Sequence, residues 1–317
     1  MRNFLRTIVS RGLAAALRLL HALGIDRTRT YVALPERLRR LVWAAPLPPT
    51  IRLEAPGRTL VFEGSRRSTI YKAYYWWGFM GYEPRTSRFF QRNAPRYKWF
   101  CDIGAYTGHY TTLFGLANDK ATIRSFEPVP SIADALSENL ARNGVKNAAV
   151  VRAAVSGASG VASFYLPKNS ISELPSIGSL RQRFRGEARF ADHGEREVTV
   201  QVKSATEALA GLPPGLGLIK IDAEGSESEI LSACAPALGA ARPDLIFEVS
   251  FPPEFSHAEV DSLLLPLGYS YCVLGEPPRK LGKLTNMTAD MLPARKDREG
   301  VAWGEVLATA HPDAINV

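Results

Sequence analysis

Short apolar runs alternate with helical patterns along the middle of the chain. The runs at 99–103, 121–126 and 218–221 have the length of buried strands. The segments 109–116 and 131–143, which follow the first two runs, have the apolar spacing of helices. Buried strands that alternate with helices are typical of a parallel sheet covered on both faces. We therefore predict an α/β fold with a doubly wound sheet.

Further strands are expected where apolar residues recur between turn signals, at 148–151, 161–166, 198–202 and 244–248. The connection over 167–197 is polar and Ser-rich and carries four arginines between 181 and 189. Connections of this length inside a compact domain are often lids or binding loops. We therefore consider 167–197 a candidate substrate lid, and a solvated surface loop fits the pattern equally well.

The first eighty residues differ in pattern from the rest. Residues 3–24 have the spacing of an amphipathic helix with a basic opposite face. Three roles stay open for it: packing on the main domain or on a second subunit of a homo-oligomer, lying on an anionic membrane surface, or acting as a transit peptide. A hairpin is predicted over 51–62. The aromatic residues of 71–82 are expected to form core or a subunit contact, with a sugar-stacking platform as the alternative.

Composition and charge exclude only a few classes of function and partner. The net charge of +8 permits an acidic partner such as a phosphosugar, nucleic acid or an anionic membrane face. Cys101, Cys234 and Cys272 are scattered in apolar contexts, which indicates reduced core residues of a cytosolic protein. No cysteine or histidine spacing suggests a metal site, and no apolar run is long enough for a spanning helix. We expect a cytoplasmic protein, with any membrane contact peripheral and made through 3–24.

The first chemically informative stretch is the turn D-x-G-x-x-x-G at 102–108, between a strand and a helix. Gly104 and Gly108 carry no Cβ and can let the backbone approach a ligand, while Asp102 can accept a hydrogen bond from it. Glu127 ends the next strand, where an acid can bind both hydroxyls of a ribose. This combination predicts a nucleoside site. The alternative is an ordinary solvated acid at a strand end.

The second stretch is K-I-D-A-E-G at 220–225. Lys220, Asp222 and Glu224 share parity, so they project to one side while the chain stays extended. Ionisable groups at a strand end are costly unless they are paired, ligand-bound or solvated. Ligands of a doubly wound sheet bind beyond the carboxyl ends of its strands. We therefore expect these side chains to face the same site as Gly104 and Glu127.

Five ordered motifs resemble the FkbM family of S-adenosylmethionine-dependent methyltransferases. They are F-C-D-I-G-A-Y-T-G-H-Y-T at 100–111, S-F-E-P-V-P at 125–130, N-L-A-R-N-G at 139–144, I-K-I-D-A-E-G-S-E at 219–227 and P-D-L-I-F-E at 243–248. The resemblance implies a class I, Rossmann-like methyltransferase domain over 81–317, with an N-terminal helical and hairpin extension over 1–80. Its sheet would have seven strands, and 269–273 and 305–308 would form the last hairpin with an antiparallel strand.

The resemblance also implies a cofactor and an acceptor. The cofactor would be S-adenosylmethionine, and family members typically methylate a hydroxyl oxygen of a sugar, glycan, glycolipid or another natural product. The residues expected to bind the cofactor's amino-acid end are Asp102, Gly104, Ala105 and Gly108, Glu127 would bind its ribose, and Pro128 and Ser156 would add contacts.

A hydroxyl acceptor needs a base to take its proton. Asp222 and Glu224 are the candidates, and His109 is an outsider. Lys220 would orient the acceptor or lower the pKa of a neighbouring carboxylate. The structural alternatives are an ion pair of Lys220 with Asp222 or Glu248, and ordinary helix-start contacts of His109. A divalent cation held by Asp222, Glu224 and Glu248 stays open as an alternative, but the spacing does not require one.

Two other functions predict different motifs. A nicotinamide-dependent oxidoreductase predicts G-x-G-x-x-G, which the sequence lacks. A basic binding module that has kept the fold without the chemistry, on nucleic acid or an anionic glycan, predicts aromatic and basic residues along one face. Only the arginines of 181–189 favour it. We therefore expect an enzyme and no nucleic-acid partner.

Overall fold

The computed structural model describes residues 12, 15, 16, 47, 48, 50–55, 58–63, 69–167, 179, 180, 195–223, 225–251, 255–274, 278–292 and 302–312. They fall into two compact units, one up to Pro84 and one from Arg85 onward. The predictions on Glu224, on the arginines of 181–189 and on nearly all of 3–24 concern residues outside these ranges.

The first unit contains the predicted hairpin. β1 (Thr50–Ala55) pairs antiparallel with β2 (Arg58–Glu63), and α4 (Thr69–Trp77) and the turn η1 (Phe79–Gly81) follow. The rings of Phe62, Tyr74 and Phe79 are buried and lie 4.8–5.5 Å apart between centroids. The aromatic stretch therefore contributes Tyr74 and Phe79 to the core of this unit.

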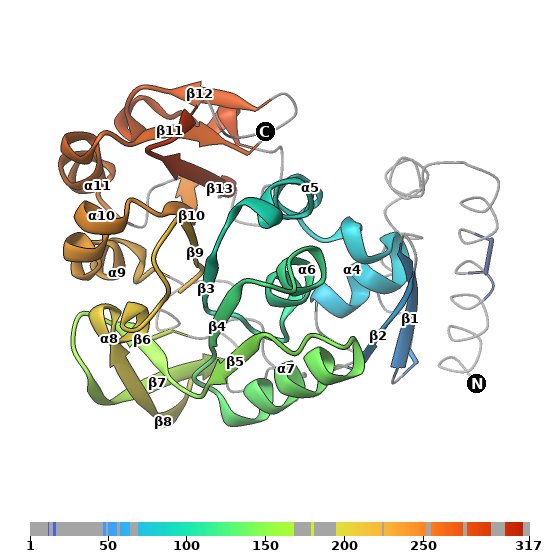
Figure 1. The fold of residues 1–317 in the computed structure, drawn as a ribbon. Coiled ribbons are helices and arrows are strands. Elements are labelled where there is room, and N and C mark those ends of the chain that lie inside the picture. Colours follow the sequence, from blue (N-terminus) through green and yellow to red (C-terminus); the bar gives the residue numbers. More distant parts are fainter. Residues whose placement is uncertain are drawn as a thin grey trace. The chain divides into compact units, whose positions relative to one another are not determined.

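The second unit is built on an eight-stranded sheet in the order β12-β11-β13-β10-β9-β3-β4-β5 (Figure 1). The bounds are β3 (Trp99–Ile103), β4 (Thr122–Phe126), β5 (Ala148–Val151), β9 (Gly217–Ile221), β10 (Asp244–Phe251), β11 (Ser270–Val273), β12 (Arg279–Leu281) and β13 (Ala302–Thr309). The five strands from β5 to β10 are parallel, and β13 runs antiparallel to β10 and β11. The predicted last hairpin is thus present, and β12 adds an eighth strand to the seven expected.

Helices cover both faces of this sheet (Figure 1). α5 (Pro84–Asn93), α6 (His109–Ala117) and α7 (Pro130–Arg142) lie on one side. α9 (Glu227–Ala233), α10 (Ala235–Ala241) and α11 (His257–Leu264) lie on the other. A second sheet of three strands has the order β6-β8-β7, from β6 (Ala154–Ser156), β7 (Gly160–Pro167) and β8 (Glu195–Ser204), and α8 (Ala205–Leu209) follows it.

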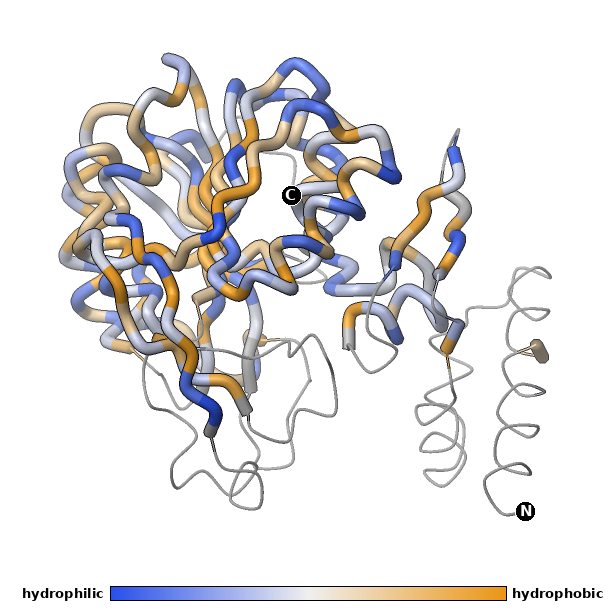
Figure 2. The backbone as a smooth tube through the Cα atoms, turned by 90° about the horizontal axis from the view of Figure 1, so that it is seen from below, coloured by the Kyte–Doolittle hydropathy of each residue, from blue (hydrophilic) through white to orange (hydrophobic). Residues whose placement is uncertain are grey.

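Strand alternation separates the two faces of the sheet. Cys101 and Ile103 of β3 belong to a buried apolar cluster with residues of α9, α10 and α11. Phe100 points to the opposite face and stacks on Phe114 of α6, with ring centroids 4.7 Å apart. Figure 2 shows the hydrophobic stretches of this unit mainly in its interior. Asp102, next in alternation to Phe100, therefore faces α6 as well.

Two further expectations concern the whole chain. Cys101, Cys234 and Cys272 are buried free thiols, as the sequence predicted. Among the described residues, no helix combines the length and apolar character that a membrane crossing requires.

The contact between Gly217 and Trp99 gives a stability prediction. The two residues are register partners on β9 and β3, and a Cβ on Gly217 would lie 1.9 Å from the Trp99 ring. Gly217→Ala should therefore destabilise the fold by about 1–3 kcal/mol through overpacking. Thermal unfolding measures this. Gly282→Ala is the matched control, because nothing lies within 4 Å of the added carbon, and equal melting temperatures for both variants would contradict the packing.

Candidate functional site

A row of polar side chains crosses the middle of the sheet on the α6 side. Asp102 of β3 is the register partner of both Ser125 on β4 and Lys220 on β9. All three are buried, with Lys220 only 3% exposed. We call Ser125, Asp102 and Lys220 the polar row. This register places Lys220 and Asp102 on the same face of the sheet.

Helix α6 closes over the polar row with matching groups. The Thr111 hydroxyl donates to Asp102 Oδ2 at 2.6 Å and lies 2.7 Å from the Ser125 hydroxyl. The Lys220 ammonium lies 4.7 Å from the centre of the Tyr110 ring, a cation–π contact. Burial raises the pKa of Asp102 to about 6, although the Lys220 charge and the Thr111 hydrogen bond oppose the rise.

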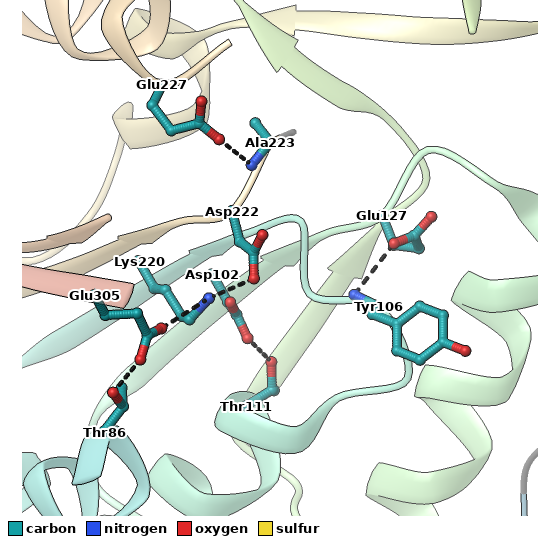
Figure 3. A network of polar contacts seen from close by, with 10 residues as sticks. All are labelled: Thr86, Asp102, Tyr106, Thr111, Glu127, Lys220, Asp222, Ala223, Glu227 and Glu305. Atoms are coloured by element: carbon teal, nitrogen blue, oxygen red, sulfur yellow. Dashed lines mark hydrogen bonds and ion pairs between the residues drawn. The ribbon is translucent and has the colours of Figure 1, made fainter. Parts of the chain in front are cut away.

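Lys220 holds the base candidate Asp222 in place (Figure 3). Its Nζ donates to Asp222 Oδ2 at 2.8 Å, and Glu305 Oε1 of β13 lies 3.6 Å from the same nitrogen. The Asp222 side chain is 29% exposed, whereas that of Glu305 is 8% exposed. The ion pair expected between Lys220 and Asp222 is therefore present, and it leaves a partly exposed carboxylate at the carboxyl end of β9.

The glycine turn packs directly against Asp222. Gly104 has a φ of +79°, and a Cβ there would lie 1.9 Å from the Asp222 carbonyl oxygen. The Asp222 amide donates to the Ile103 carbonyl at 3.0 Å. Gly108 has a φ of +90°, and its added Cβ would meet Leu136 of α7. Glycine is therefore needed at both positions because of the positive φ and because protein atoms occupy the space of a Cβ. These reasons hold whether or not a ligand approaches the turn.

Glu127 lies at the end of β4, beside the same turn. Its Oε2 accepts from the Tyr106 amide at 3.1 Å and its Oε1 from the Val129 amide at 2.9 Å. Tyr106 has a φ of +48°, a conformation that non-glycine residues rarely adopt and that clusters at functional sites. Burial raises the pKa of Glu127 to about 7 against these two hydrogen bonds.

His109 begins α6, as predicted, and is 2% exposed. Its Nε2 lies 2.8 Å from the Ser87 hydroxyl of α5. Burial lowers the pKa of His109 to about 3, with the Lys220 charge acting in the same direction. The imidazole is therefore neutral at physiological pH and a weak base.

The remaining predicted residues are placed as follows. Ala105 is buried in the glycine turn, where its amide donates to the Phe126 carbonyl at 2.9 Å, and Pro128 follows Glu127 and is half-buried. Ser156 lies on β6 of the second sheet, where its hydroxyl donates to Glu229 of α9. The placement of Glu224 lies outside the described residues.

Two functional candidates were missed by the sequence reasoning. Glu227, at the start of α9, accepts from the amides of Ala223 and Gly225, each at 2.9 Å, and so holds the loop after Asp222. Glu305 reaches Lys220 from β13 and accepts a hydrogen bond from the Thr86 hydroxyl of α5. Only the last letter of the motif I-K-I-D-A-E-G-S-E pointed to Glu227. No local signal pointed to Glu305.

The described residues fit S-adenosylmethionine by their chemistry. A carboxylate can accept about four hydrogen bonds. Glu127 accepts two from backbone amides, so it can accept two more from ribose hydroxyls. Asp102 supplies a carboxyl beside the glycine turn, which suits the cofactor's amino group. No group of three or more His, Cys, Asp or Glu gathers as metal ligands in the part of the chain that the structure describes.

Comparison with solved structures finds methyltransferases at low identity. The methyltransferase FkbM from Methylobacillus flagellatus KT is 15% identical, with a TM-score of 0.42, over 68% of this chain and 44% of that one. M. jannaschii TYW2, solved in complex with AdoMet, is 11% identical with a TM-score of 0.42, over 83% and 86%. Precorrin-6y C5,15-methyltransferase from Geobacter metallireducens GS-15 is 13% identical with a TM-score of 0.35, over 71% and 86%. This chain thus spans less than half of the Methylobacillus protein.

None of the curated proteins compared matches the chain. The family model described as the methyltransferase FkbM domain matches residues 102–271, more than half of the 317 residues. This range begins at Asp102 and includes the glycine turn, Glu127, Lys220 and Asp222. The expected family is thereby confirmed, and the chain belongs to the FkbM methyltransferase family.

Proposed function

We propose that the protein is an S-adenosylmethionine-dependent O-methyltransferase that acts on a hydroxyl of a sugar, glycan or glycolipid. The observation that carries the proposal is the position of Asp222. It is a partly exposed carboxylate at the carboxyl end of β9, hydrogen-bonded to a buried lysine and packed on the glycine turn. An alcohol acceptor needs a base in this place, because its proton must leave as the methyl group arrives.

The residues of the first turn hold the cofactor in this proposal. Glu127 accepts hydrogen bonds from the two ribose hydroxyls, and Asp102, Gly104, Ala105 and Gly108 surround the amino-acid end. When bound, S-adenosylmethionine supplies a methyl group on a sulfonium sulfur, so its S–CH₃ bond breaks as an O–CH₃ bond forms and a neutral thioether remains. The protein's own tasks are then positioning and deprotonation.

Asp222 takes the proton of the acceptor hydroxyl and later releases it to water. Lys220 keeps the carboxylate oriented through its 2.8 Å hydrogen bond. His109 is a poorer candidate, because it is buried and its pKa of about 3 lies far below the operating pH. Glu224 follows Asp222 by two residues and stays the alternative base.

The first test uses a nearly isosteric substitution of the proposed base. Asp222→Asn should reduce methyl transfer by about 10²-fold or more, the range for loss of a general base, and leave S-adenosylmethionine affinity within a few-fold. Transfer of labelled methyl to a panel of simple methyl glycosides measures the rate, and calorimetry measures the affinity. Glu224→Gln is the parallel variant.

A purely structural role for Asp222 gives a different result. In that case Asp222→Asn would lower the melting temperature, and the folded fraction would turn over at the wild-type rate. Normal turnover in both Asp222→Asn and Glu224→Gln would remove these two acids as the base.

The second test concerns the pH dependence of cofactor binding. Because burial raises its pKa to about 7, Glu127 should be mostly ionised at pH 8 and mostly protonated at pH 6. A protonated acid accepts the ribose hydroxyls poorly, so the dissociation constant should rise about tenfold between pH 8 and pH 6. Calorimetry at several pH values measures it.

Glu127→Gln is the control for that titration. It should weaken binding at pH 8 by about 1.5–3 kcal/mol, the range for a hydrogen bond to a charged group. Its affinity should also lose most of the dependence on pH. A variant that keeps both the wild-type affinity and the wild-type pH profile would show that Glu127 does not bind the cofactor.

We also propose a cytoplasmic location with peripheral membrane contact through residues 3–24. Support comes from the basic amphipathic pattern of that segment and from the buried free cysteines. The full-length protein should bind anionic liposomes and be released by high salt, since salt screens the attraction. Deletion of 1–24 should abolish this binding and leave cofactor affinity intact, and indifference of the full-length protein to liposomes would instead favour packing of the segment on protein.

A further inference from the structure

Glu305 is a buried carboxylate whose two oxygens contact side chains from two different elements. Its Oε2 accepts from the Thr86 hydroxyl of α5, and its Oε1 lies 3.6 Å from the Lys220 ammonium of β9. It reaches this place from β13, whose register sets Glu305 opposite Glu248 of β10. Figure 3 shows Thr86, Glu305, Lys220 and Asp222 in one continuous line of contacts.

Glu305 also lies outside the part of the chain that defines the family. The family match ends at residue 271, whereas Lys220 and Asp222 fall within it. The chain therefore brings a carboxylate from its last strand to the lysine that holds the base candidate. Burying a carboxylate here has a desolvation free energy that its contacts with Thr86 and Lys220 must offset. An apolar side chain that only filled the space would have no such cost.

The geometry points to Glu305 as a positioning residue for Asp222: held by Thr86, it shares the Lys220 ammonium with Asp222 and so determines how strongly that ammonium binds the Asp222 carboxylate. The inference rests on the proposed role of Asp222 as the base. Glu305 itself touches neither acceptor nor cofactor in this account.

The electrostatic consequence has a definite sign. An ammonium beside a carboxylate favours its ionised form and makes it a weaker base. The negative charge of Glu305 offsets part of that effect. Without it, the full Lys220 charge acts on the two carboxylates beside it, Asp222 and Asp102. Asp102, whose pKa Lys220 already lowers, should then release its proton at lower pH.

Other charged and titratable groups face this network from the neighbouring elements. They are Asp102 on β3, His109 and Tyr110 on α6, and Glu248 on β10. Lys220 contributes to the pKa values of Asp102 and His109, lowering both. Because His109 is neutral above about pH 3, it does not interfere with titrations near neutrality.

The experiment follows the aspartate carboxyl groups directly and needs no acceptor. Protein labelled with ¹³C at the aspartate carboxyls is titrated by NMR, and the Asp102 signal is assigned by its loss in Asp102→Asn. In Glu305→Gln, the titration of Asp102 should move to lower pH, by about one unit, a tenfold change in proton affinity. Glu197→Gln removes one exposed strand carboxylate on β8 and should leave the Asp102 titration unmoved.

A second variant protects the test against loss of the fold. Glu305→Asp keeps the charge and withdraws it from Lys220 by one methylene, so it should move the Asp102 titration in the same direction by less. An unmoved Asp102 titration in folded Glu305→Gln or Glu305→Asp, with only a lower melting temperature, would overturn the inference.

Turnover on the methyl glycoside panel separates this inference from the proposed function. Glu305→Gln should lower the rate roughly three- to tenfold in the wild-type background, since a weaker base transfers the proton less readily. It should have no further effect in the Asp222→Asn background, because the pathway through Asp222 is already lost. Wild-type turnover in Asp222→Asn would remove the proposed base and leave the titration result to stand alone. An additive loss in the double variant would overturn the role through Asp222.

Discussion

The buried ammonium of Lys220 is the charge around which the site is arranged. An isolated ammonium inside a protein costs several kcal/mol, so it must be paired and hydrogen-bonded. Here the partners come from separate parts of the chain: Asp222 from the following loop, Glu305 from β13 and the Tyr110 ring from α6. Register places Asp102 beside the same lysine. The order of the strands, the position of α6 and the last hairpin therefore all contribute partners to the Lys220 ammonium.

The buried acids Asp102 and Glu127 make the stability of the fold depend on pH. Burial raises the pKa of Asp102 to about 6 and of Glu127 to about 7, above the values of about 4 expected in the unfolded chain. The folded protein therefore holds more protons in that interval. Their contribution to stability is full below about pH 4 and is lost as the pH rises through 6 and 7. A bound ligand that donates to these carboxylates would offset the loss, which is a physical reason for such groups to lie at a binding site.

Local signals were enough to predict the central elements. The apolar run before Gly104 indicated β3, the spacing after Gly108 indicated α6, and strand parity placed Lys220 and Asp222 on one side. Each of these inferences depends on neighbours within a few residues, where propensity and alternation are decisive. The position of Glu127 at the end of β4 followed from the same kind of reasoning, whereas its burial did not.

The parts that were not predicted depend on pairing between distant segments. Glu305 is 85 positions from Lys220 in the sequence, and only the insertion of β13 beside β10 brings the two together. β12 is three residues long and polar, so it carried no strand pattern, yet it pairs with β11. The hydroxyl of Ser156 donates to Glu229 of α9, a partner that no motif around Ser156 indicates.

The contacts around Asp222 show how the two predicted stretches become one site. The Asp222 amide donates a hydrogen bond to the Ile103 carbonyl, and its carboxylate accepts one from Lys220. Its carbonyl oxygen lies 1.9 Å from the position that a Cβ of Gly104 would take. On the other side, Glu227 holds the amides of Ala223 and Gly225. Backbone and side chain are therefore fixed from both directions. Because the glycine turn and Asp222 are in direct contact, a change in the position of one is transmitted to the other, and the distance between them is set by the packing of β3 against β9.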